Sequence, residues 1–193
     1  LSQIDNINLE LIKDIKVYRG NNSSFFGSSS GGVISITTLD DFEKDFINIG
    51  YSIGSFNSKK TQATIGFGDD NKKMIFFFFY TKSDGFRNHS AYENFNLNFK
   101  YLKKIGFRNS LQIIANILDS PDAQDPGGLN KEEVSSNRRQ GRARNISYDS
   151  REKVKQYKLG INLYSKLDRL KLTNSLYFNQ RLFDGKLPIS TGG

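Results

Sequence analysis

The chain contains no cysteine and no tryptophan, and it has only one histidine and three prolines among 193 residues. Without cysteine it forms neither disulfide bonds nor thiolate metal sites. With His89 as the single histidine, we expect no metal site built from protein side chains. No run of about 18 apolar residues occurs, so no transmembrane helix is predicted. The absence of cysteine fits a reducing compartment and also a route through the periplasm to an outer membrane.

What the sequence does contain is a surplus of Phe and Tyr. Aromatic residues make up 13% of the chain, with 16 Phe and 9 Tyr, while the whole hydrophobic fraction is only 36%. This composition is poor for a compact soluble interior and typical of many half-buried strands. The chain begins at Leu1 without an initiator Met or a signal-like apolar core. We therefore interpret it as an internal fragment or a processed piece.

From Asp41 onward, apolar side chains recur at every second position, which is the period of a strand with two different faces. The clearest segment, residues 94–101, alternates three Asn and one Lys with Phe, Leu, Phe and Tyr. One segment, residues 74–80, is apolar on both faces. The pattern predicts an all-β, antiparallel chain. Its seven predicted strands are residues 47–53, 63–68, 74–80, 95–101, 111–118, 157–167 and 170–178.

The predicted connections alternate in length. Every second one is minimal, at residues 69–72, 104–106 and 168–169. Two of the three others, residues 82–92 and 120–155, are long, and the third, residues 56–59, is a short turn. Outer-membrane barrels show this asymmetry between short periplasmic turns and long outer loops. Periodicity alone fits a soluble two-sheet sandwich equally well.

Residues 12–38 precede these strands and consist of two β-branched apolar runs joined by a loop of Gly, Ser and Asn. The glycines allow positive φ, so the segment predicts a strand, a polar turn and a second strand. No Gly-Lys-Ser/Thr follows and the glycines lack GxGxxG spacing, so a phosphate-binding loop is not predicted. An ordinary hairpin loop remains an alternative interpretation of these residues.

Three stretches, in order, resemble TonB-dependent outer-membrane receptors of the ferric-siderophore branch. The first has Arg19-Gly20, an aromatic residue before Gly27, and Gly31-Gly32 followed by VISI. The second is SDGFRNHSAY at residues 83–92, and the third is DSPDAQDPGGL at residues 119–129. The chain departs from the family pattern at Asn21, where the family usually has Pro, and at residues 25–26, where a Leu-Tyr pair is usual.

The resemblance implies a fold and a function. It identifies residues 1–40 as the C-terminal part of a plug domain. Residues 41–193 become the N-terminal strands, about seven, of a transmembrane β-barrel that is incomplete because its edge strands lack partners. The implied function is TonB-dependent uptake of a ferric-siderophore complex across the outer membrane of a Gram-negative cell. The implied partners are that ligand, TonB, outer-membrane lipid and lipopolysaccharide. The plug motif comprises Arg19, Gly20, Gly27, Gly31 and Gly32.

Candidate ligand contacts lie in the predicted outer loops. Arg87, His89 and Tyr92 have the donors and the ring surface to bind an anionic or catecholate-type chelate. For His89, a lone histidine in a polar loop, a solvated side chain is the favoured alternative. A second cluster, formed by Arg138, Arg139, Arg142 and Arg144, suits carboxylate or phosphate. Three roles for this cluster stay open, in this order: a solvated loop, contact with lipopolysaccharide phosphates, and steering of an anionic ligand.

Other classes of function are not predicted. The net charge of +8 admits nucleic acid as a partner, but no aromatic residues are interleaved with the arginines as a stacking surface would require. No carboxylate lies in a catalytic pattern with His, Ser or a second acid, so we expect no enzyme, no catalytic residue and no cofactor. Two alternatives remain, namely a passive porin-like channel and a soluble all-β binding module.

Overall fold

The computed structural model describes residues 11–20 and 31–189. The chain divides into two compact units, one ending at Asp41 and the other beginning at Phe42. Both are antiparallel β-structures, so the all-β prediction is confirmed. No helix in the described ranges has the length and the apolar character needed to cross a membrane.

The first unit contains one β-hairpin. Strands β1 (Ile12–Arg19) and β2 (Gly32–Thr38) pair antiparallel, with a register shift near Ile12. Lys13 and Asp40 form an ion pair of 2.7 Å, which raises the pKa of Lys13 through a hydrogen bond from its amine to that carboxylate. The two predicted strands are confirmed. The loop of residues 21–30, with Gly27, lies outside the described residues.

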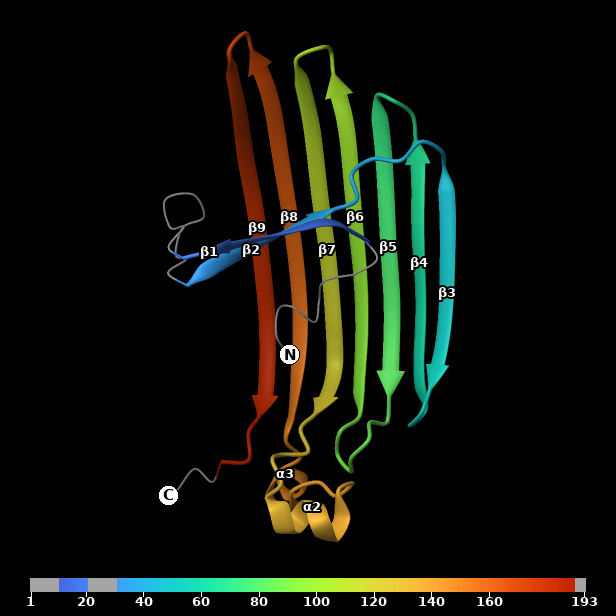
Figure 1. The fold of residues 1–193 in the computed structure, drawn as a ribbon, viewed down its shortest axis with the longest axis vertical. Helices are drawn as coiled ribbons and strands as arrows, with labels where there is room; N and C mark the ends of the chain where they lie inside the picture. The colour runs from blue at the N-terminus through green and yellow to red at the C-terminus, as the bar shows by residue number, and fades with distance from the viewer. Residues whose placement is uncertain (1–10, 21–30, 190–193) are drawn as a thin grey trace. The chain divides into compact units, whose positions relative to one another are not determined.

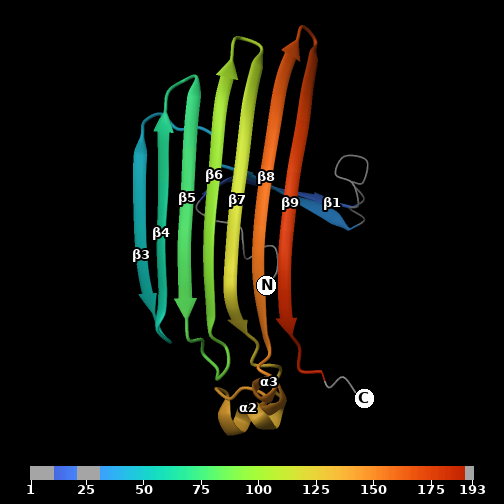
Figure 2. The ribbon, with the colours of Figure 1, turned by 180° about the vertical axis from the view of Figure 1, so that it is seen from behind.

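The second unit is one seven-stranded sheet in which each strand pairs with the next one along the chain (Figures 1 and 2). Three tight turns lie at one end, and two short helices, α2 (Lys131–Asn137) and α3 (Ala143–Ser147), lie at the other (Figure 1). The strands are β3 (Phe46–Gly54), β4 (Ser58–Gly68), β5 (Lys72–Ser83), β6 (Tyr92–Ile105), β7 (Asn109–Gln124), β8 (Arg151–Leu167) and β9 (Leu170–Lys186).

The strands extend further than the sequence pattern predicts. The predicted connection 120–155 shortens to residues 125–150, because β7 continues to Gln124 and β8 already begins at Arg151. Pro121 lies in this extension, at a register shift between Ser120 and Ala123, where a residue without an N–H is tolerated. The long connection 82–92 likewise shortens to 84–91. Polar strand ends carry no apolar alternation, and the pattern therefore missed them.

The paired registers place alternate side chains on two faces of the sheet. The apolar face carries a row that crosses all seven strands, namely Ile47, Ile65, Phe76, Phe99, Ala115, Leu159 and Phe178. The opposite face, called the polar face below, carries the row Thr64, Phe77, Asn98, Asn116, Lys158 and Asn179 on β4 to β9.

Strand β5 is apolar on both faces, as its sequence predicts. Its apolar side chains on the polar face, Ile75, Phe77 and Phe79, are buried, with Phe77 only 1% exposed. On the apolar face, Phe76 packs against Phe99 with ring centroids 4.7 Å apart, and Phe78 packs against Phe95 at 5.5 Å. The polar face is therefore not uniformly polar, and β5 contributes its apolar part.

Candidate functional site

Two connections pack together at the end of the sheet that carries the helices. We call residues 84–91 and 125–150 the loop platform. The main-chain N–H of Asn88 donates to the carbonyl of Arg139 at 2.7 Å, joining the shorter connection to the longer one. Within the longer one, the N–H of Arg142 donates to the carbonyl of Pro126 at 2.7 Å. Helix α2 begins with a capping box between Asn130 and Glu133, so the platform has a defined local structure.

Arg87 lies between the two connections. Its guanidinium donates to three main-chain carbonyls: those of Gly127 at 2.6 Å, Gln140 at 2.9 Å and Pro126 at 3.1 Å. The sequence predicts Arg87 as a ligand contact because of its donors. The structure places those donors on carbonyl oxygens of the longer connection.

The other two predicted ligand contacts differ from each other. His89 has a φ of +63°, and its Nε2 lies 2.8 Å from the carbonyl oxygen of Ser150, to which it donates in the tautomer protonated at Nε2. Tyr92 opens β6 and is 42% exposed. Thus Arg87 and His89 are both brought against residues 125–150, and Tyr92 remains accessible.

The four arginines of the predicted anion cluster all lie in the longer connection and are exposed. Arg139 donates from Nε to the carbonyl of Phe86 at 3.3 Å, and its guanidinium lies 5.4 Å from the ring centre of Phe56. Arg144 lies 5.9 Å from the ring centre of Tyr148. The side chains of Arg138 and Arg142 form no hydrogen bond or ion pair with the described residues. The platform therefore presents positive charge to solvent.

An ionic cluster at the base of the platform was not predicted. Arg151 donates to Asp122 at 2.9 Å and also to Asp149, and Lys186 lies 3.1 Å from Asp149. These partners, Arg151 first, lower the pKa of Asp149. The cluster ties the last residues of the connection to β7 and β9. Asp149 and Arg151 are neighbours in the sequence, but Asp122 and Lys186 join them only through the pairing of β7, β8 and β9.

The polar face carries an amide network that joins β6 and β7. The Nδ2 of Asn116 donates to Oδ1 of Asn96 and of Asn98, both at 2.9 Å, and Nδ2 of Asn98 donates to Oδ1 of Asn96 at 2.7 Å. Asn96 is fully buried, with 0% exposure. The sequence predicts the polar row on β6, but Asn116 joins it only through the register of β7.

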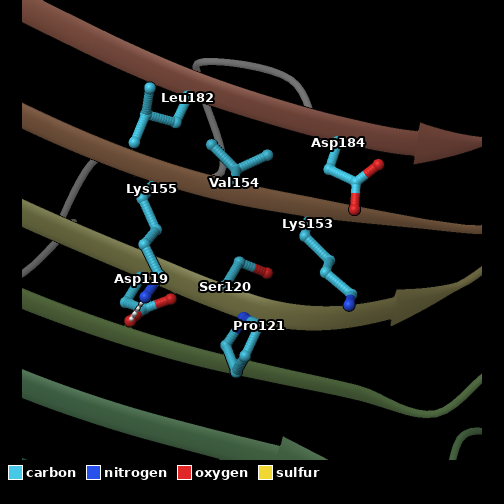
Figure 3. Close-up of a pocket in the computed structure, with 8 residues that line it drawn as sticks. All are labelled: Asp119, Ser120, Pro121, Lys153, Val154, Lys155, Leu182 and Asp184. Atoms are coloured by element: carbon cyan, nitrogen blue, oxygen red, sulfur yellow. Dashed lines mark ion pairs between the residues drawn. The ribbon is translucent and has the colours of Figure 1, made fainter.

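A hollow of about 360 Å³ lies across β7, β8 and β9 beside the register shift of β7 (Figure 3). Pro121 and Leu182 contribute apolar surface to it, and Lys155 pairs with Asp119 at 3.5 Å in its wall. Registers place Asp119, Lys155 and Leu182 on the apolar face, close to its end at the loop platform. The hollow marks a point where apolar and charged side chains of that face meet.

The described part of the predicted plug motif lies in and beside the β1–β2 hairpin. Arg19 ends β1 and pairs with Gly32, and Gly20 follows with a φ of +86°. Gly32 has a φ of +139°, and a Cβ there would lie 2.7 Å from the carbonyl oxygen of Tyr18. Gly31 has open space around it. Two of these glycines therefore adopt backbone conformations that other residues rarely adopt.

Within the described ranges, no group of three or more His, Asp or Glu side chains is placed to hold a metal ion. A scan of the sequence against protein-family models finds no match.

Proposed function

We propose that this chain is part of a TonB-dependent receptor that takes up a ferric-siderophore complex across the outer membrane. Residues 41–193 would supply barrel strands, and residues 1–40 the end of the plug. The observation that carries the proposal is the apolar face of the sheet, which on β5 and β6 is bounded by charged residues at both ends of the strand. The three stretches that resemble the ferric-siderophore branch add the family and the ligand class.

The length of the apolar face matches a bilayer. On β5 the apolar face reads Lys72, then Met, Phe, Phe and Tyr, and then Lys82, and on β6 it runs between Lys103 and Glu93. Ten residue steps span about 33 Å along a strand. At a tilt of about 45° this gives a height of about 23 Å, close to the apolar band of outer-membrane barrels.

Exposure of this face also favours lipid as its surroundings. Ile49 is 77% exposed and Leu176 is 70% exposed on this face. They lie on β3 and β9, the two edge strands of the sheet. Soluble monomers rarely expose a contiguous apolar surface of more than a few hundred Å². In hydrocarbon such a face is favourable, provided that the free edges of β3 and β9 find further strands. The sheet would then be one part of a larger barrel.

The remaining features receive roles in this proposal. The polar face would line a lumen filled by water or a plug, and the loop platform would face the outside. Iron would arrive already bound by its chelator, so no protein metal site is required. The exposed arginines would attract an anionic chelate or bind lipopolysaccharide. Coupling to TonB rests on the resemblance alone.

The proposal is tested with the protein that contains this chain, expressed in a Gram-negative host without its own siderophore receptors and starved of iron. The probes are radioactive iron bound to citrate, to a hydroxamate and to a catecholate siderophore. We expect the protein in the outer-membrane fraction and uptake of at least one probe that is lost when TonB is deleted. Uptake that persists without TonB would indicate a passive channel, and a monodisperse protein in buffer without detergent would indicate a soluble module.

A further inference from the structure

The two connections of the loop platform converge on one side chain. Arg87 belongs to the shorter connection. The carbonyls that it binds belong to the beginning of the longer one, at Pro126 and Gly127, and to Gln140, the third residue after the end of α2. One guanidinium therefore fixes two segments of the longer connection that are separated by a helix. Its planar, forked donors suit this task, because they reach several acceptors in a fixed geometry.

Close backbone contacts surround this junction. A Cβ on Gly141 would lie 2.6 Å from the carbonyl oxygen of Asn88, so the main chains of the two connections approach each other directly. Gly127 has a φ of +69°, and a Cβ there would lie 2.5 Å from Oδ1 of Asn145. Asn145 is 3% exposed and donates to Asp125 at 2.9 Å. The junction therefore has room for no larger residue at these two glycines.

We propose that Arg87 is a positioning residue that joins the two connections into one binding surface, rather than a residue that contacts the ligand. The ligand class, an anionic iron chelate, rests on the function proposed above. Arg138, Arg142 and Arg144 lie in the longer connection and are exposed, so they are the cations available to such a ligand. Arg87 acts through them, because it binds the carbonyl of Gln140, which lies between Arg138 and Arg142 in the segment after α2.

The first experiment measures amide hydrogen exchange by mass spectrometry on the complete protein in detergent. It compares Arg87→Ala with the wild type, and uses Arg138→Ala as a control that loses the same charge from an exposed position. We expect exchange in residues 125–150 to rise about tenfold or more in Arg87→Ala, because hydrogen bonds of a charged donor are lost. We expect no change in β5 to β7 and none in Arg138→Ala. Unchanged exchange in Arg87→Ala would overturn the proposal.

A second pair of variants tests the same junction without changing Arg87. Gly141→Ala introduces a methyl group against Asn88, whereas Gly128→Ala introduces one where nothing lies within 4 Å. We expect amide exchange in residues 125–150 to be faster than in the wild type for Gly141→Ala, and unchanged for Gly128→Ala. This pair keeps the proposal testable if Arg87→Ala fails to insert into the membrane. Equal exchange in both glycine variants would contradict a close junction.

Uptake of the three iron probes separates positioning from ligand contact. A positioning role predicts that Arg87→Ala raises the half-saturating concentration about tenfold and leaves the maximal rate nearly unchanged. Arg87→Lys should restore part of both the affinity and the exchange protection, since Lys keeps some of the donors. A loss of affinity with unchanged exchange would make Arg87 a ligand contact and overturn the proposal. If the wild type takes up no iron, the proposed function fails, while the exchange data still decide the role of Arg87.

Discussion

The two faces of the seven-stranded sheet invert the usual relation between polarity and burial. On β8, Gln156 of the polar face is 2% exposed, whereas Tyr157 and Leu159 of the apolar face are 40% and 43% exposed. The edge strand β9 is exposed on both faces. In a soluble protein, large apolar side chains are the most often buried ones. The inversion fits the membrane location proposed above, in which the apolar face meets lipid and the polar face meets a polar interior. The same kind of substitution should therefore change the free energy of unfolding by different amounts on the two faces.

The largest difference in the free energy of unfolding is expected between two arginine substitutions at adjacent residues of β9, one on each face. Leu176 pairs with Ile161 on the apolar face, and Tyr177 pairs with Gly160 on the polar face. Their exposed fractions are 70% and 82%, so neither substitution removes much packing. In a lipid-embedded protein, Leu176→Arg should lower the free energy of unfolding by about 2–4 kcal/mol, and Tyr177→Arg should cost less than about 1 kcal/mol.

The measurement is reversible urea unfolding of the complete protein in lipid vesicles. The same pair serves as its own control, because both variants add one arginine at neighbouring positions. Equal, small effects of the two variants would show that both faces meet water, and the proposed membrane location would then be wrong.

A smaller effect is expected from the amide network of the polar face. Asn116→Leu removes the donor shared by Asn96 and Asn98, and leaves the buried oxygen of Asn96 and the half-buried oxygen of Asn98 with fewer partners. We expect a loss of about 1–3 kcal/mol in the free energy of unfolding. Ile117→Leu, the neighbouring change on the apolar face, conserves volume and should cost less than about 1.5 kcal/mol. If both variants lowered the free energy of unfolding by the same amount, water would be replacing the lost hydrogen bonds of the Asn116 amide.

The contrast between the faces could be predicted from single strands, but the contacts between strands could not. The alternation in residues 94–101 identifies β6 and its two faces directly. The amide network needs Asn116 beside Asn98, and this depends on the register of β7, which no local pattern specifies. For the same reason the apolar row across seven strands emerges only from the pairing.

The loop platform shows where donor capacity misleads a sequence-based prediction. Arg87 and His89 have the donors expected of ligand contacts, and both donors instead meet main-chain carbonyls that lie 39 to 61 positions away in the sequence. Main-chain carbonyls are present at every residue, so the sequence cannot indicate which of them a given arginine will bind. Pro121 falls in the predicted connection 120–155, but it lies at a register shift within β7.

The smallest effect is expected at the border of the apolar face. Lys82 and Glu93 form an ion pair of 3.5 Å on β5 and β6, and their side chains are 55% and 32% exposed. An exposed pair of this kind contributes about 0.2–1 kcal/mol and weakens with salt. Lys82→Leu should therefore lower the free energy of unfolding in vesicles by less than about 1 kcal/mol, and high salt should reduce the difference. If Lys82 lay within the hydrocarbon instead, the same substitution would stabilise the protein, because it removes a charge from lipid. Urea unfolding at low and high salt thus locates the border of the apolar face to within a few residues of Lys82.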